Sequence, residues 1–146
     1  MKFFEGTFAN PEAYNTFLTG SADNMIKLWD LRMNKHVREF SGHHKNRHLD
    51  IGFQVTNCYR YLLTGSEDRS AYVYDIGTSQ LVGKTMNRDH GDAVVDVAVN
   101  PVYMEWASAS IDGHVRTYRY QAVKTKNKIG NNRGGGTQEK LNAITL

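Results

Sequence analysis

The sequence is poor in the residues that mark secreted and membrane-spanning proteins. It holds one cysteine, Cys58, and two prolines among 146 residues, so no disulfide can form within the chain. It has no run of about 18 apolar residues, which excludes a transmembrane helix and gives no reason to expect a membrane partner. A single thiol suits a reducing compartment, so we expect an intracellular protein, cytoplasmic or nuclear.

Positive charge is also scarce where a phosphate-binding surface would need it. The formal net charge is +3, but residues 122–146 hold five lysines and arginines against one acidic residue. That segment therefore carries +4, and residues 1–121 carry −1. The body of the chain offers no excess positive field to a nucleic acid, so nucleic acid is an unlikely partner for it.

One 14-residue pattern occurs three times. It reads FLTGSADNMIKLWD at 17–30, LLTGSEDRSAYVYD at 62–75 and WASASIDGHVRTYR at 106–119. The aspartates Asp23, Asp68 and Asp112 are 45 and then 44 residues apart. A fixed period in this range indicates a repeat architecture. Each copy has two short strand patterns around a turn, further strand patterns lie between the copies, and no helical periodicity occurs. This predicts an all-β fold made of four-stranded propeller blades.

The pattern resembles WD repeats, with GSADNMIKLWD as its clearest copy, and the resemblance covers about residues 4–121. It implies a partial β-propeller of three four-stranded blades, the last lacking its outer strand. The expected units are an N-terminally truncated repeat at 1–40, repeats at 41–86 and 87–121, and a basic, Gly-rich tail at 122–146. The tail is expected to be disordered over about 124–140. The final letters, LNAITL, have strand propensity and could complete a blade.

The resemblance also implies a hydrogen-bonded chain of polar side chains in each blade. In the first copy it implies Thr19, Asp23 and Trp29; in the second, His43, Thr64, Asp68 and Tyr74; in the third, His90, Ser108, Asp112 and Tyr118. Buried polar groups must be hydrogen-bonded, and a fully satisfied network specifies one arrangement of strands. We interpret these residues as structural.

Catalysis and metal binding are the alternatives for these residues. A Ser/His/Asp set could serve a hydrolase, but here it recurs with the repeat and lacks a Gly-x-Ser-x-Gly elbow. The cluster HHKNRH at 43–48 has no cysteine and no nearby carboxylate before Asp50, which makes a poor metal site. We expect no enzyme activity, no metal and no cofactor.

The predicted function is a scaffold for protein–protein interaction, with partners that the sequence does not name. One alternative comes from the stretch 17–32, which resembles a box that docks the adaptor of cullin-4 ubiquitin ligases, with Trp29, Asp30 and Arg32 in place. A second alternative is RNA binding through the basic tail. Three blades form only an arc of a propeller, so we also expect the end faces to need further blades or self-association.

Overall fold

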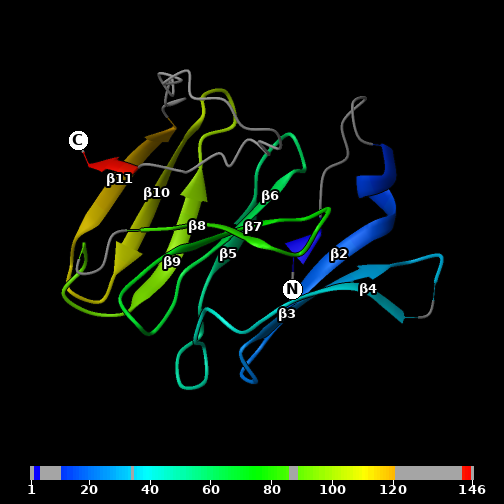
Figure 1. Ribbon diagram of the computed structural model, residues 1–146, viewed down its shortest axis with the longest axis horizontal. Coiled ribbons are helices and arrows are strands. Elements are labelled where there is room, and N and C mark those ends of the chain that lie inside the picture. The colour runs from blue at the N-terminus through cyan, green and yellow to red at the C-terminus, as the bar shows by residue number, and fades with distance from the viewer. Residues whose placement is uncertain (1, 4–10, 34, 86–88, 121–142, 146) are drawn as a thin grey trace, which may run out of the picture.

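The computed structural model describes residues 2–3, 11–33, 35–85, 89–120 and 143–145, and these form three antiparallel four-stranded sheets (Figure 1). The first sheet consists of β1 (Lys2–Phe3), β2 (Thr16–Ser21), β3 (Met25–Asp30) and β4 (Lys35–Phe40). The second consists of β5 (Phe53–Val55), β6 (Tyr61–Thr64), β7 (Tyr72–Asp75) and β8 (Leu81–Lys84). The third consists of β9 (Val94–Val99), β10 (Glu105–Ser110), β11 (Val115–Tyr120) and β12 (Ala143–Thr145). A 3-10 helix, η1 (Pro11–Asn15), precedes β2.

The repeat has the same register in all three sheets. Phe17 pairs with Trp29 in the first, Leu62 with Tyr74 in the second and Trp106 with Tyr118 in the third. The residue after each repeated aspartate has a positive φ: Asn24, Arg69 and Gly113, at 64°, 68° and 82°. This left-handed residue closes the turn between the second and third strands, and Asn and Gly tolerate it best. The predicted blades are therefore confirmed.

The third sheet corrects one prediction. The last copy was expected to lack its outer strand, but Ala143–Thr145 pair with Tyr118–Tyr120 as β12. The apolar and β-branched letters AIT extend the otherwise unpaired edge of β11. The stretch predicted to be disordered, 124–140, lies outside the described residues, and so does the basic part of the tail to which RNA binding was assigned.

The second sheet lies between the other two and buries both of its faces (Figure 1). Successive residues of a strand point to opposite faces, so Leu62 packs toward the first sheet and Leu63 toward the third. The junction of the first and second sheets is filled by large side chains: Leu18, Ile26, Leu28, Phe40, Phe53, Leu62, Tyr72, Tyr74 and Ile76. The junction of the second and third sheets holds smaller ones: Leu63, Ala71, Val73, Val94 and Val97.

The second and third sheets also meet through backbone. The Gly52 amide donates to the Val95 carbonyl at 2.7 Å, and the Val94 amide donates to the Ser66 carbonyl at 3.0 Å. A Cβ atom on Gly65 would lie 2.2 Å from the Val94 carbonyl oxygen, inside van der Waals contact. A side chain at position 65 is therefore incompatible with this approach of the two sheets.

The connections between strands gather at two rims. One, here the η1 rim, comprises residues 11–15, 31–33, 56–60, 76–80 and 100–104. The other, here the histidine rim, comprises residues 22–24, 41–52, 65–71, 89–93 and 111–114. Hydrogen bonds join loops within a rim, as from Asn57 Nδ2 to the Pro101 carbonyl at 2.7 Å and from the Asn46 amide to Asn24 Oδ1 at 2.8 Å.

We predict that Gly65→Ala lowers the free energy of unfolding by about 1–3 kcal/mol, because the new methyl group forces the Val94 backbone away. Urea unfolding followed by circular dichroism measures this. Gly77→Ala is the matched control, since its Cβ would meet only a side-chain oxygen of Asp75, at 3.3 Å, and no backbone atom. Equal losses in the two variants would contradict the close approach.

Candidate functional site

The structure brings the four residues of the third blade together, and hydrogen bonds join three of them. His90 Nε2 lies 2.7 Å from Ser108 Oγ, and Ser108 Oγ lies 3.4 Å from the Tyr118 hydroxyl. His90 Nδ1 faces Asp112 Oδ2 at 3.6 Å. Burial lowers the pKa of His90, whereas hydrogen bonds from the backbone, first from His114, lower the pKa of Asp112. The carboxylate thus ties the turn to the loop before β9.

This arrangement has the atom order of a Ser-His-Asp triad, but it cannot meet a substrate. His90 and Ser108 are each 1% exposed, and the Ser108 hydroxyl also contacts Tyr118. An attacking oxygen must be within reach of a bound carbonyl, and this one lies inside the sheet packing. The geometry suits a structural role.

The second blade corrects the predicted histidine. His44, not His43, is buried, and its Nδ1 lies 2.9 Å from the Tyr74 hydroxyl. Gly42 has a φ of 84°, and after this turn the His43 side chain is exposed while the His44 ring enters the core. Burial lowers the pKa of His44 to about 4 and raises the pKa of Tyr74 to about 12.

Asp68 and Thr64 also have other partners than expected. The Tyr72 hydroxyl and Lys84 Nζ both donate to Asp68 Oδ2, the latter at 3.2 Å. The Thr64 hydroxyl donates to the Gly65 carbonyl at 3.1 Å. The reason lies in the second copy itself. Tyr72 occupies the position of Lys27 and Arg116 in the other copies, and its hydroxyl, rather than a histidine, donates to the Asp68 carboxylate.

In the first blade only part of the predicted set is joined. Trp29 Nε1 donates to Thr19 Oγ1 at 2.9 Å. Asp23 is exposed and accepts the Met25 amide at 3.1 Å, which closes the turn.

Among the residues that the structure describes, no group of three metal-ligating side chains occurs. Nor does the described part contain a helix long and apolar enough to cross a bilayer.

Asp30 and Arg32 form a fixed pair on the η1 rim. Arg32 Nε and Nη2 donate to the two Asp30 carboxylate oxygens at 3.0 and 2.7 Å, and the Arg32 amide donates to Oδ1 at 2.8 Å. These bonds lower the pKa of Asp30 to about 2. The Asp30 side chain is 8% exposed and that of Arg32 is 56% exposed, so the carboxylate orients a guanidinium at the surface.

The η1 rim also concentrates exposed apolar side chains. Of the eight large apolar side chains that stand out in the described residues, six lie on this rim: Tyr14, Leu31, Met33, Val102, Tyr103 and Met104. The other two are Ile111, on the histidine rim, and Val115, at the start of β11. Large exposed apolar patches mark interaction surfaces in soluble proteins.

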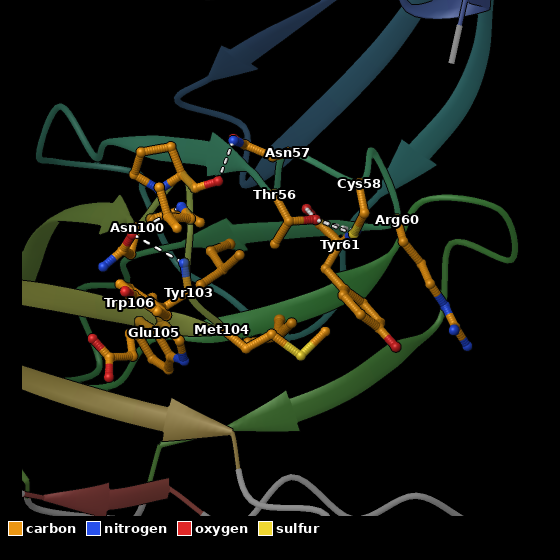
Figure 2. Close-up of a pocket in the computed structure, with 15 residues that line it drawn as sticks. Thr56, Asn57, Cys58, Arg60, Tyr61, Asn100, Tyr103, Met104, Glu105 and Trp106 are labelled. Carbon is orange, nitrogen blue, oxygen red and sulfur yellow. Dashed lines mark hydrogen bonds between the residues drawn. The ribbon is translucent and has the colours of Figure 1, made fainter. Parts of the chain in front are cut away.

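A groove of about 500 Å³ opens on the η1 rim between the second and third sheets (Figure 2). Apolar side chains form most of its walls: Tyr61, Leu63, Val73, Val99, Met104 and Trp106. Sequence reasoning missed both the groove and the rim. The apolar run Val102–Met104 after Pro101 was an available signal, because loops between strands are usually polar.

Comparisons with known proteins agree with this geometry. A family model described as "WD domain, G-beta repeat" matches residues 8–30 and 34–75. The β-propeller domain of Cps50 (Swd1) from Myceliophteria thermophila superposes with a TM-score of 0.61, covering 72% of this chain and 32% of that one. The chain belongs to the WD-repeat family. Sequence identity to that domain is 20%, so the likeness concerns the fold alone.

Several curated WD-repeat proteins resemble the chain. A WD repeat-containing protein of Dictyostelium discoideum is 30% identical over 77% of this chain and 22% of its own length. The ribosome biogenesis protein WDR12 homolog of Culex quinquefasciatus is 29% identical over 75% of this chain and 25% of its own. The E3 ubiquitin-protein ligase COP1 of Arabidopsis thaliana is 37% identical over 41% of this chain and 8% of its own. The chain thus spans less than a third of the length of each of these relatives.

We predict that the second-blade histidine makes stability pH-dependent. Unfolded His44 has a pKa near 6.5 and folded His44 one of about 4, so the unfolded state binds the proton first as the pH falls. Stability is therefore lost as the pH drops from 6.5 toward 4, by about 2 kcal/mol at pH 5. Urea unfolding at several pH values measures the slope. His44→Gln should flatten it and the control His43→Gln should not; equal slopes would argue against His44 as the buried partner.

Proposed function

We propose that the chain is a non-catalytic module for protein–protein interaction and that its η1 rim is the binding surface. The observation that carries this proposal is the gathering of six exposed apolar side chains on one rim of an otherwise well-buried fold. A single exposed apolar side chain needs no explanation, but a cluster loses contact with water only when a partner covers it.

The opposite rim supports the same assignment by contrast. Its side chains are largely engaged within the chain: Glu67 accepts the amides of His48 and Leu49, Ser66 accepts that of Lys45, and Asp112 accepts those of Gly91 and His114. These bonds hold the blades together. The polar side chains of this rim thus serve the fold, and the apolar η1 rim is left for recognition.

We predict that acidic substitutions on the η1 rim abolish partner binding without unfolding the protein. The pair Leu31→Asp and Tyr103→Asp places charges at positions that are 60% and 68% exposed. The control pair, Ile111→Asp and Val115→Asp, places them at positions 53% and 68% exposed away from this rim. Affinity purification with quantitative mass spectrometry should find proteins that wild type and control retain and the η1-rim variant loses. Identical protein lists for the two variants would end the proposal.

A second candidate is a substrate receptor of a cullin-4 ubiquitin ligase, held through Trp29, Asp30 and Arg32. Its specific support is the orientation of Arg32 by the recessed Asp30 carboxylate, since a planar, pre-oriented guanidinium is a favourable interface anchor. Trp29, hydrogen-bonded to Thr19 and stacked on Phe17 at 6.1 Å, holds the end of the strand from which the pair projects. The resemblance to COP1, itself a ubiquitin-protein ligase, is in keeping with this candidate.

We predict that the purified adaptor subunit of the cullin-4 ligase binds the chain and that Arg32→Ala removes this binding. Loss of a central interface arginine commonly weakens binding by about 2 kcal/mol or more. Arg38→Ala, an exposed arginine on β4, is the control and should bind as wild type does. Pull-down with purified proteins suffices. Adaptor binding that survives Arg32→Ala, or none by wild type, would leave the first candidate alone.

A further inference from the structure

The groove exists because the second blade junction is filled by smaller side chains than the first. Four aromatic rings, those of Phe40, Phe53, Tyr72 and Tyr74, are buried between the first and second sheets. The buried cluster between the second and third sheets consists of Leu63, Ala71 and three valines. Its aromatic neighbours stand at the edge of the cluster: Tyr61 and Trp106 are only partly buried against it, and the buried Tyr118 stacks on Trp106. Sheets that meet at their inner strands diverge outward, so small side chains leave space there. The space opens at the η1 rim between Tyr61 and Trp106.

The walls of the groove are held in place before any partner arrives. Asn57 Nδ2 donates to the Pro101 carbonyl at 2.7 Å and joins the loops on its two sides (Figure 2). Asn100 Oδ1 accepts the Val102 and Tyr103 amides at 2.9 and 3.1 Å, which fixes the loop before β10. Trp106 stacks on Tyr118 with ring centroids 4.2 Å apart. A preformed site loses less conformational entropy on binding than a mobile one.

The surface around the groove is too wide for a small ligand. The groove takes one or two large apolar side chains, but Val102, Tyr103 and Met104 beside it are 77%, 68% and 67% exposed. A small molecule inside the groove would leave those three side chains in water. A polypeptide can place one side chain in the groove and cover the loop with its neighbours, which removes all of these apolar side chains from water.

The charges at the mouth select the sign of the partner. Glu105 is neutralised by Arg119, whose Nε donates to its carboxylate at 2.6 Å. Arg60 is 62% exposed, its guanidinium lies 5.1 Å from the Tyr61 ring centroid, and its Nε is 3.6 Å from the recessed Asp75 carboxylate. The ion pair with Asp75 is longer than a good hydrogen bond, and the exposed guanidinium is therefore accessible to a second carboxylate.

We propose that this groove binds a short peptide segment of another protein, anchored by one bulky apolar side chain and flanked by a carboxylate that pairs with Arg60. The inference rests on the proposed function, because it names the class of partner for one part of the η1 rim. The apolar anchor lies between Tyr61 and Trp106 and contacts Met104. The acidic neighbour adds to the incomplete Arg60–Asp75 pair.

The test uses the full 146-residue chain and a phage-displayed library of random dodecapeptides. Selected peptides are synthesised and titrated against protein that carries a fluorophore on Cys58, the single cysteine, which is exposed at the mouth of the groove. We expect a consensus of Leu, Met, Phe or Trp beside Asp or Glu. We expect Met104→Asp and Arg60→Glu each to weaken binding about tenfold or more, which corresponds to the loss of one anchoring contact.

Matched controls carry the same changes of charge elsewhere. Ile111→Asp replaces an exposed apolar side chain on the histidine rim, and Arg38→Glu reverses an exposed arginine on β4; both should bind as wild type does. All four substitutions are at the surface, and urea unfolding verifies that each variant folds. Equal affinity across the four variants, a consensus without an apolar anchor, a consensus without an acidic residue, or no selected peptide at all would overturn the inference. Cellular proteins that still depend on Leu31 and Tyr103 would then leave the proposed function intact.

Discussion

The backbone contact between the second and third blades is the constraint on which the site depends. Gly65 lies against the Val94 carbonyl, and the Gly52 and Val94 amides donate across the junction. Because backbone contacts join the two sheets near their inner strands, the space between them farther out must be filled by side chains. Large aromatic rings fill that spread at the first junction. At the second junction the buried cluster is Leu63, Ala71 and three valines, and the groove opens beside it between Tyr61 and Trp106.

The polar chains show that a repeated position does not ensure a repeated partner. Asp23, Asp68 and Asp112 stand at one position of the pattern, yet Asp112 meets a histidine, Asp68 a tyrosine hydroxyl and Asp23 a backbone amide. A carboxylate at the turn accepts from whichever donor the local geometry places within reach. In the second copy that donor is Tyr72, two residues before Tyr74, the tyrosine of the pattern. In each blade the aspartate accepts hydrogen bonds at the turn, but the donors differ from one blade to the next.

The sequence was sufficient for the fold because its signal is periodic and local. Turn residues at a fixed spacing and short strands on either side predict the blades, and the register of Phe17 with Trp29 recurs in each sheet. It was insufficient for His44, since which of two adjacent histidines is buried depends on the φ of Gly42. It was also insufficient for β12. The strand propensity of Ala143–Thr145 could be recognised, but the pairing of this segment depends on the free edge of β11, more than 20 residues earlier in the chain. The groove could not be predicted from the sequence, because its lining comes from separate segments, 56–63, 73 and 99–106, that only the fold brings together.

The end faces of the arc differ from each other in a way that follows from the same repeat. The face of each blade that carries the aromatic of the pattern packs against the blade before it, as Tyr74 does against Leu28 and Phe40. In the first blade this face presents Phe17 and Trp29, stacked and only half-buried. The far face of the third blade presents Ala107 and Thr117 beside the Glu105–Arg119 ion pair and the exposed Val115. One end face is therefore aromatic, and the other combines small, charged and aliphatic side chains. The η1 rim contains loops from all three blades and therefore follows the direction in which the blades succeed one another.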